Sequence, residues 1–240
     1  MLAVSRISKT FSNGTQALAD VSFQIAAGEF VCLLGPSGCG KSTALRLAAG
    51  LLAPDSGSVT YPGGKPEIGF VFQEPTLMPW ADVLANAQLP LDLKRLQRGE
   101  ADQRAARALA RVGLAGFERA FPRELSGGMK MRVSIARALA AQPKLLLLDE
   151  PFAALDEITR NELGDDLSRL WRADGLTVLF VTHSAAESSY LASRVLVMTP
   201  RPGRIAADII LPTGRDDRLA PQTVEAQRRI SSALNNAMAA

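Results

Sequence analysis

Residues 29–50 read "EFVCLLGPSGCGKSTALRLAAG", and this stretch decides the fold class. An uninterrupted apolar run ends at Gly35, and an apolar-periodic segment begins at Lys41, so we predict a buried strand, a tight loop and a helix. The loop satisfies the pattern G-x-x-x-x-G-K-[ST] in the strand–loop–helix context that the pattern requires. Its glycines let the backbone wrap closely around a polyphosphate and aim N–H groups inward. The stretch therefore predicts a phosphate-binding loop in an α/β protein.

The residues that end this loop suggest its ligand. Lys41 would bring positive charge to the β- and γ-phosphates of a nucleoside triphosphate, and the Ser42 hydroxyl would ligate Mg²⁺. A chance glycine-rich turn is the alternative interpretation, and the flanking strand and helix argue against it. We expect a nucleoside triphosphate and Mg²⁺ as ligands.

Further polar residues end apolar segments downstream. The segment 145–148 is LLLL and runs directly into Asp149 and Glu150. We expect Asp149 to serve Mg²⁺ and Glu150, on the opposite face of an extended chain, to act as general base. Gln73 and His183, the single histidine, end two other apolar strands, and polar groups at strand ends converge at the sheet edge where ligands bind. Together with Lys41 they predict a phosphate-hydrolysing site.

Composition bounds the function class. The 240-residue chain has a net charge of +3, no dense Lys/Arg run and only 5% aromatic residues, which disfavours a nucleic-acid partner. Cys32 and Cys39 lack the spacing of a metal site, and we expect a reducing cytoplasm. No apolar run reaches membrane-spanning length, so we expect a protein that neither spans nor crosses a membrane.

Periodicity predicts the order of elements. Antiparallel strands are expected at 2–7 and 21–25, and a helix at 41–52. The later elements are expected as strands at 67–73, 144–150, 177–183 and 194–198, and helices at 127–142 and 157–173. The fold class is α/β: a P-loop NTPase core with a mostly parallel sheet, N-terminal antiparallel strands and an inserted helical subdomain. We assign the core to 1–74 and 126–213, the subdomain to 75–125 and a peripheral helical tail to 214–240.

A second glycine-containing turn, "ELSGGMKMR" at 124–132, opens a predicted helix. The N-terminus of a helix attracts anions because its backbone N–H groups are unpaired and the helix dipole is positive there. The turn lies beyond the inserted subdomain. If that subdomain projects sideways, Ser126, Gly127 and Gly128 cannot fold back onto the phosphate loop of their own chain.

The order of the phosphate loop, Gln73, "LSGGM", "LLLLDEP", "ALD" (154–156) and His183 resembles the ATP-binding subunit of ABC transporters over almost the whole chain. The resemblance implies an ATPase whose two copies pair head to tail. Each ATP would lie between the phosphate loop of one copy and the LSGG-type turn of the other. Asp156 would lie at the interface between the copies.

The resemblance also implies individual roles. Phe11 would stack on adenine, Gln73 would sense metal and water, and His183 would hold the γ-phosphate. Asp149 would aid Mg²⁺ and Glu150 would act as base. Ser126, Gly127 and Gly128 would serve the partner's ATP. The residues that would cradle the phosphates are Gly35, Pro36, Ser37, Gly38, Cys39, Gly40, Lys41, Ser42 and Thr43.

Four positions depart from the usual pattern of that family. Met129 and Met131 stand where Gln is common, which leaves any side-chain role of Gln open. Ser184 follows His183 where Asp is frequent, and the sequence gives no physical account of it. Phe11 replaces a frequent Tyr and keeps the stacking face.

Two short stretches, residues 72–91 and "VMTPRPGRI" (197–205), resemble importer ATPases for nitrate, sulfonates, taurine and pyrimidine-type solutes. The resemblance implies permease subunits and, indirectly, a periplasmic or extracellular solute-binding protein as partners. It also implies a peripheral place on the cytoplasmic face of the inner membrane. The segment 77–80, Leu-Met-Pro-Trp, either docks a permease helix or caps the local core.

Other ATPase classes fit less well. ATPases of chromosomes carry a long coiled-coil insertion, whereas the interval 43–125 is short and lacks sustained heptads. A GTPase is disfavoured because no NKxD stretch is present. A non-transport mechanical regulator of an envelope complex remains an alternative.

Overall fold

The computed structural model describes residues 1–212 and 217–239, which belong to two compact units. The first unit comprises Met1–Pro66 and Gly175–Ala240, and the second comprises Glu67–Asp174. Both combine strands and helices, so the predicted α/β class is confirmed. The finer division into core, inserted subdomain and tail stays a prediction, and its boundary between residues 213 and 214 lies outside the described residues.

The first unit contains an antiparallel sheet with the strand order β2-β1-β4. Its strands are β1 (Leu2–Thr10), β2 (Gln16–Ile25) and β4 (Ser56–Thr60). The two predicted antiparallel strands are confirmed and are longer than predicted. β4 was not predicted, because its sequence SGSVT is mostly polar and exposed and carries no buried alternation.

The first unit also contains strands that run in parallel beside the central β3 (Phe30–Leu34). β3 pairs in parallel with β7 (Thr177–Thr182) and β8 (Arg194–Met198), and β8 pairs antiparallel with β9 (Ile205–Ile210). Every residue of β3 is fully buried, which explains its unbroken apolar sequence. β9 was not predicted, because its exposed and half-buried residues alternate without a buried face.

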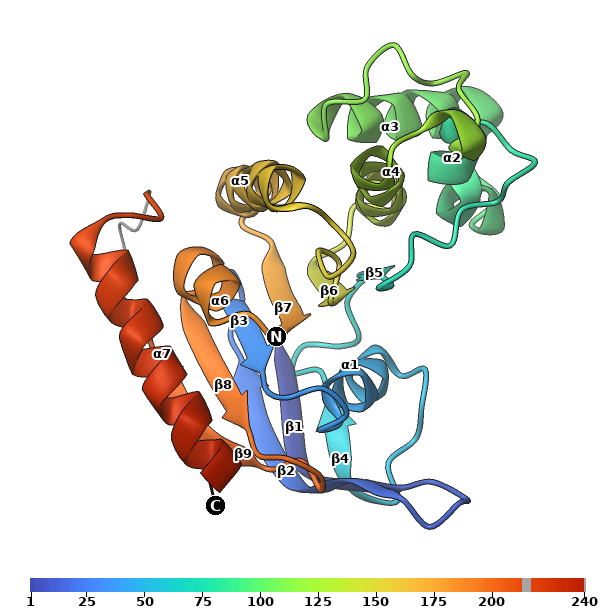
Figure 1. Ribbon diagram of the computed structural model, residues 1–240. Helices are drawn as coiled ribbons and strands as arrows, with labels where there is room; N and C mark the ends of the chain where they lie inside the picture. The colour runs from blue at the N-terminus through green and yellow to red at the C-terminus, as the bar shows by residue number, and fades with distance from the viewer. Residues whose placement is uncertain (213–216, 240) are drawn as a thin grey trace. The chain divides into compact units, whose positions relative to one another are not determined.

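The helices of the first unit are α1 (Lys41–Ala49), α6 (Ala185–Leu191) and α7 (Pro221–Ala239). α7, red in Figure 1, packs against α6, β8 and β9 and buries Ala226 and Ile230. The predicted tail therefore contains a helix over residues 221–239, whereas its status as a separate peripheral part stays a prediction.

The second unit contains two parallel strands, β5 (Ile68–Val71) and β6 (Leu145–Asp149). Its helices α2, α3 and α4 pack against one another, and α4 also contacts α5 (Figure 1). The helices are α2 (Val83–Leu93), α3 (Arg98–Arg111), the short 3₁₀ helix η1 (Pro122–Glu124), α4 (Gly127–Ala140) and α5 (Glu157–Asp174).

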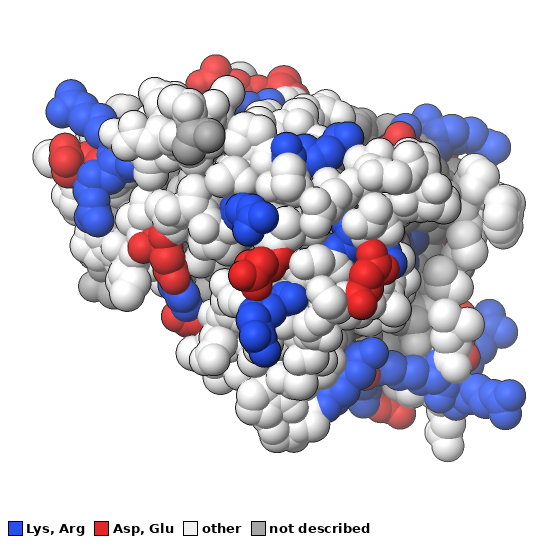
Figure 2. Space-filling model, turned by 90° about the horizontal axis from the view of Figure 1, so that it is seen from below, with Lys and Arg blue, Asp and Glu red and all other residues white. Residues whose placement is uncertain are grey.

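The surface agrees with a weakly basic chain. Figure 2 shows Lys and Arg interspersed with Asp and Glu on the face that it draws, among many uncharged residues. Among the helices of residues 1–212 and 217–239, none combines the length and the hydropathy needed to span a membrane.

Candidate functional site

The phosphate loop lies between β3 and α1, as predicted. Gly38 and Gly40 have φ values of 76° and 102°, a region that favours glycine. Lys41 is 3% exposed, and its Nζ donates to the carbonyl oxygens of Gly35 at 2.8 Å and Pro36 at 3.0 Å. The backbone N–H of Cys39 also donates to Pro36 O, at 3.3 Å. An ammonium and an amide thus converge on one carbonyl oxygen, a position that a phosphate oxygen can take.

The back of this loop is tightly packed. A Cβ on Gly40 would lie well under 3.0 Å from the carbonyl oxygen of Ala17 in β2, a separation that real Cβ atoms do not show. A Cβ on Gly35 would lie 2.8 Å from Cys39 Sγ. These two glycines are therefore required by packing within the chain, in addition to any approach of a ligand.

His183 lies at the same sheet edge as the phosphate loop. Leu34 pairs with Thr182, so Gly35 and His183 each follow a strand at adjacent carboxyl ends. His183 is exposed. The polar groups at this edge have the placement expected for ligand binding in an α/β sheet.

Ser184, whose role the sequence left open, is the N-cap of α6. Its Oγ accepts from the Glu187 N–H at 3.2 Å, and its own N–H donates to Thr182 Oγ1 at 3.0 Å. Serine and aspartate are both favoured N-caps, so either residue satisfies the helix terminus after His183.

Phe11 lies in the turn between β1 and β2. Its N–H donates to Thr15 O, and its carbonyl accepts from Gly14 N–H, both at 2.9 Å. The Phe11 side chain is 41% exposed, which leaves part of the ring accessible for stacking.

The second unit brings three other predicted residues to one sheet edge. Val71 of β5 pairs with Leu148 of β6, so Gln73, Asp149 and Glu150 lie around adjacent carboxyl ends. Asp149 is 3% exposed, whereas Gln73 is exposed.

The expected geometry of Glu150 is wrong. β6 ends at Asp149, and Glu150 has a φ of 44°, in the left-handed region. The chain turns here, and the Ala153 N–H donates to Glu150 O at 3.2 Å. Asp149 and Glu150 therefore do not alternate along an extended strand. A strained backbone at a non-glycine residue next to a buried carboxylate is typical of a functional position.

The LSGG turn begins α4, with Ser126 as N-cap. Ser126 Oγ accepts from the Met129 N–H at 3.2 Å, and Ser126 and Gly127 are exposed. Gly128 is buried: a Cβ there would lie well under 3.0 Å from Thr159 Cγ2 of α5. Met131 is 2% exposed and belongs to the core. The structure thus separates an exposed part of the turn from a packed part.

Met129 is half-buried and lines a cavity of about 630 Å³ in the second unit. Arg132, one turn further along α4, donates to Val112 O at 2.8 Å and forms an ion pair with Asp166 of α5. These contacts connect the end of α3, helix α4, which follows the LSGG turn, and helix α5.

The chain after Gln73 is fixed to α4. Arg137 donates to Pro75 O and Thr76 O at 2.9 Å each, and to Thr76 Oγ1 at 3.0 Å. Burial lowers the pKa of Arg137. Thr76 has a φ of 46°, so this guanidinium holds a strained turn. Nothing in the amino-acid sequence distinguishes Arg137 from the other arginines of the helices.

A buried amide also shapes this segment. Asn86 of α2 is fully buried; its Oδ1 accepts from Met78 N–H at 2.7 Å, and its Nδ2 donates to the carbonyls of Met78 and Ala81 at 3.1 Å each. Trp80 is 77% exposed, whereas Leu77 and Met78 are half-buried. Trp80 therefore does not cap the local core.

The predicted magnesium ligands are Ser42, Gln73 and Asp149, all oxygen donors. Among the described residues, there is no cluster of three or more His, Cys, Asp or Glu that could hold a metal. Mg²⁺ is usually bound through one or two carboxylates and completes its shell with phosphate and water, so oxygen ligands that include one carboxylate, Asp149, are chemically suited to it.

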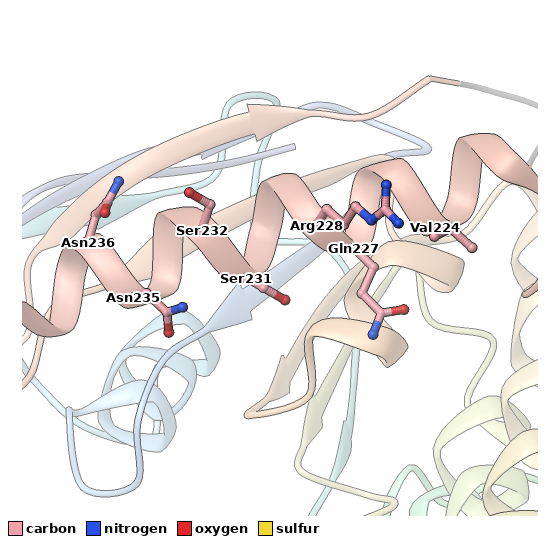
Figure 3. Close-up of a pocket in the computed structure, with 7 residues that line it drawn as sticks. All are labelled: Val224, Gln227, Arg228, Ser231, Ser232, Asn235 and Asn236. Carbon is pink, nitrogen blue, oxygen red and sulfur yellow. The ribbon is translucent and has the colours of Figure 1, made fainter.

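A separate polar groove of about 600 Å³ runs along α7 and contains none of the predicted site residues (Figure 3). Its lining residues are Val224, Gln227, Arg228, Ser231, Ser232, Asn235 and Asn236.

Comparison with known proteins identifies the family to which the chain belongs. A profile of the ABC transporter family matches residues 18–153. The chain is 43% identical to an uncharacterised ABC transporter ATP-binding protein of Methanocaldococcus jannaschii, over 98% of this chain and 91% of that protein. It is 46% identical to the taurine import ATP-binding protein TauB of Yersinia pestis, over 84% of this chain and 81% of that protein.

Solved structures agree. The ATP-binding cassette MJ0796, in a dimeric post-hydrolysis state bound to ADP and Pi, has a TM-score of 0.80 and 34% identity, covering 89% of this chain and all of that chain. The protein cbiO1 of Clostridium perfringens, part of the ABC transporter complex cbiONQ, has a TM-score of 0.80 and 29% identity, covering 98% and 96% of the two chains. The chain belongs to the ABC transporter family and is one of its ATP-binding ATPase subunits.

Proposed function

We propose that this ATPase powers a membrane importer for a small solute of the nitrate, sulfonate or taurine type, or a pyrimidine-like solute. Two copies would pair head to tail, with each ATP held between the phosphate loop of one and the LSGG turn of the other. The observation that carries the ATP site is the convergence of Lys41 Nζ and the Cys39 N–H on Pro36 O. Both donors become available to a phosphate when it displaces that internal acceptor.

The residues of the proposed site would have different chemical roles. Lys41 neutralises phosphate charge, and Ser42, Gln73 and Asp149 provide oxygen ligands for Mg²⁺, which supplies charge stabilisation when bound. Glu150 accepts a proton from the attacking water. Its left-handed backbone sets the side-chain direction where β6 ends.

Two exposed side chains complete the proposed site. His183 would donate to the γ-phosphate from the end of β7, and the exposed ring of Phe11 would stack on adenine. Both belong to the first unit, as does the phosphate loop.

Pairing of two copies is supported by the exposed Ser126 and Gly127 at the N-terminus of α4, where backbone N–H groups and the helix dipole suit an anion. It is also supported by similarity to a cassette solved as a dimer with ADP and Pi. The Ser126 side chain already caps α4, so the backbone of the turn would carry most of the contact.

Association with a permease would use the segment 77–80. Trp80 presents a large exposed apolar surface on a segment that Asn86 and Arg137 hold from inside the second unit. An apolar side chain on a fixed support suits an apolar permease helix. The subunit would then sit on the cytoplasmic face of the inner membrane, and a solute-binding protein would act through the permease.

A subunit-mixing experiment tests the shared site. Lys41→Ala damages the phosphate loop, and Gly127→Asp places a like charge where a partner's phosphate would bind. Each variant alone should be nearly inactive in ATP hydrolysis. An equimolar mixture should recover about a quarter of wild-type activity, because half of the dimers are mixed and each mixed dimer keeps one of two sites. If the mixture is no more active than the single variants, the shared site is wrong.

Identification of the transported solute requires the permease. Copurification of the membrane subunits, followed by uptake assays with taurine, nitrate and a pyrimidine in proteoliposomes, tests the transport function. If the permease does not stimulate ATP hydrolysis and none of the solutes enters the proteoliposomes, the transport function is wrong.

A further inference from the structure

The turn Thr199–Arg204 between β8 and β9 lies directly against the phosphate loop. Arg201 Nε donates to the carbonyl oxygen of Gly38 at 3.0 Å. β8 is the parallel neighbour of β3, so the turn leaves the same sheet edge from which the phosphate loop begins. The whole contact lies within the first unit.

Gly203 brings the turn close to the phosphate loop and also joins it to β2. Its N–H donates to Ala17 O at 2.9 Å, and its carbonyl accepts from Ala19 N–H at 3.0 Å. A Cβ on Gly203 would lie well under 3.0 Å from the carbonyl oxygen of Cys39. Only glycine allows this approach between two backbones.

The turn is held by its own hydrogen bonds. Thr199 N–H donates to Arg204 O at 3.0 Å, and Thr199 Oγ1 accepts from Arg204 N–H at 3.0 Å and donates to Pro202 O at 3.2 Å. Arg201 therefore extends from a fixed support, which limits the conformational entropy that its hydrogen bond costs.

The consequence for the phosphate loop follows from peptide geometry. The carbonyl of Gly38 and the N–H of Cys39 belong to one planar trans peptide, so they point in opposite directions. Arg201 holds the carbonyl on the outside, and the Cys39 N–H then points into the loop toward Pro36 O. That N–H is one of the two donors that converge where we place a phosphate oxygen.

We propose that Arg201 and Gly203 position the Gly38–Cys39 peptide for phosphate binding, so that the Thr199–Arg204 turn is a brace for the phosphate loop. The inference rests on the proposed ATP site. Arg201 acts through the peptide and is a positioning residue; the nucleotide is bound by the loop.

The same turn offers a matched control. Arg204 is also exposed, and its backbone carries the turn's hydrogen bonds to Thr199. Arg204→Ala removes the same charge and a similar side chain from the same turn while it leaves the Gly38 contact intact. Arg201→Lys keeps the charge and restores a donor.

The test compares the nucleotide affinity of the full-length wild type with that of Arg201→Ala, Arg201→Lys and Arg204→Ala, measured by calorimetry with ATP and ADP. Arg201→Ala should bind both nucleotides about fivefold more weakly, the effect of one hydrogen bond at an exposed site. Arg204→Ala should match the wild type, and Arg201→Lys should recover part of the loss. Because the Arg201 side chain is exposed, the melting temperature without nucleotide should stay unchanged.

Hydrogen–deuterium exchange separates the brace from the proposed function. Without nucleotide, the backbone amides of residues 37–40 should exchange faster in Arg201→Ala than in Arg204→Ala. Gly203→Ala should produce the same change and weaken binding further. Equal exchange and equal affinity in the two arginine variants would overturn the brace. A wild type that binds neither nucleotide, with the exchange difference retained, would overturn the ATP site and leave the brace.

Discussion

Gly128 of the LSGG turn allows a test of why this turn requires glycine. A Cβ on Gly128 would overlap Thr159 Cγ2, a short and stiff β-branched side chain that cannot move far. A Cβ on the neighbouring Gly127 would meet only Leu155 Cδ2, at 3.9 Å, an ordinary van der Waals distance. The two glycines are adjacent in sequence, yet Gly128→Ala should damage folding and Gly127→Ala should not.

The magnitude follows from two opposing effects. Overpacking of a filled core costs about 1–3 kcal/mol. Alanine in place of glycine within a helix returns roughly 0.5–1 kcal/mol. Because the Cβ would overlap a stiff side chain, the upper part of that cost applies, about 2–3 kcal/mol. The net loss for Gly128→Ala is then about 1–2.5 kcal/mol, which corresponds to a melting temperature lower by roughly 2–10 °C for a chain of this size.

Thr159→Ser provides the rescue variant. It deletes the overlapping methyl group but keeps the hydroxyl, which forms a hydrogen bond to Asp156. The pKa of Asp156 is lowered by hydrogen bonds from the backbone N–H of Thr159 and from its side chain. In the Gly128→Ala background, Thr159→Ser should restore at least half of the lost stability. The double-mutant cycle should give a coupling energy of about 1 kcal/mol.

The assay is thermal and urea unfolding of the four variants and the wild type without nucleotide. If Gly128→Ala and Gly127→Ala are equally stable, or if Thr159→Ser gives no recovery, the packing assignment of Gly128 is wrong. Any loss of ATPase activity in Gly128→Ala would then be attributed to the shared site alone.

Three further outcomes are expected. Glu150→Gln should keep ATP binding, abolish turnover and accumulate an ATP-bound dimer on size-exclusion chromatography; a fully active monomer would exclude Glu150 as base. Asn86→Ala should destabilise the chain by about 2–4 kcal/mol in urea unfolding, because Asn86 is fully buried and its part-buried hydrogen bonds to the N–H and carbonyl of Met78 and the carbonyl of Ala81 are lost. Asp208→Asn should be less stable than wild type at pH 7. Arg194 lowers the folded-state pKa of Asp208, so its contribution is full above the unfolded pKa and is lost as the pH falls through the folded one. Equal stability at pH 7, or a gap that does not shrink as the pH falls below the unfolded pKa of an aspartate, would contradict this.

The candidate site residues at strand ends were predictable because apolar runs stop there. The burial of β3, β6 and β7 makes those runs continuous: the phosphate loop begins directly after β3, Asp149 ends β6, and His183 directly follows β7. β4 is mostly polar, and Asp208 interrupts the apolar residues of β9, which has no buried face; both strands were missed.

Contacts between distant residues could not be predicted from one sequence. Arg201 and Gly38 are 163 positions apart, and nothing in their spacing connects them. The left-handed Glu150 was missed for another reason: alternation along a strand was assumed to continue past the end of β6. The Arg137 contacts to Pro75 and Thr76 are equally invisible, since helical periodicity indicates which face is buried and not what that face touches.

Glycine is required in the phosphate loop and in the LSGG turn for two different kinds of reason. Gly40 and Gly128 are required because backbone or side-chain atoms of the same chain leave no room for a Cβ. Gly127 is exposed and meets no such obstacle, so folding alone does not require glycine there. A ligand or a partner that approaches the turn would supply the missing constraint. If Gly127→Ala folds like the wild type but loses ATPase activity, the constraint lies outside the single chain. That combination is what a site shared between two copies demands.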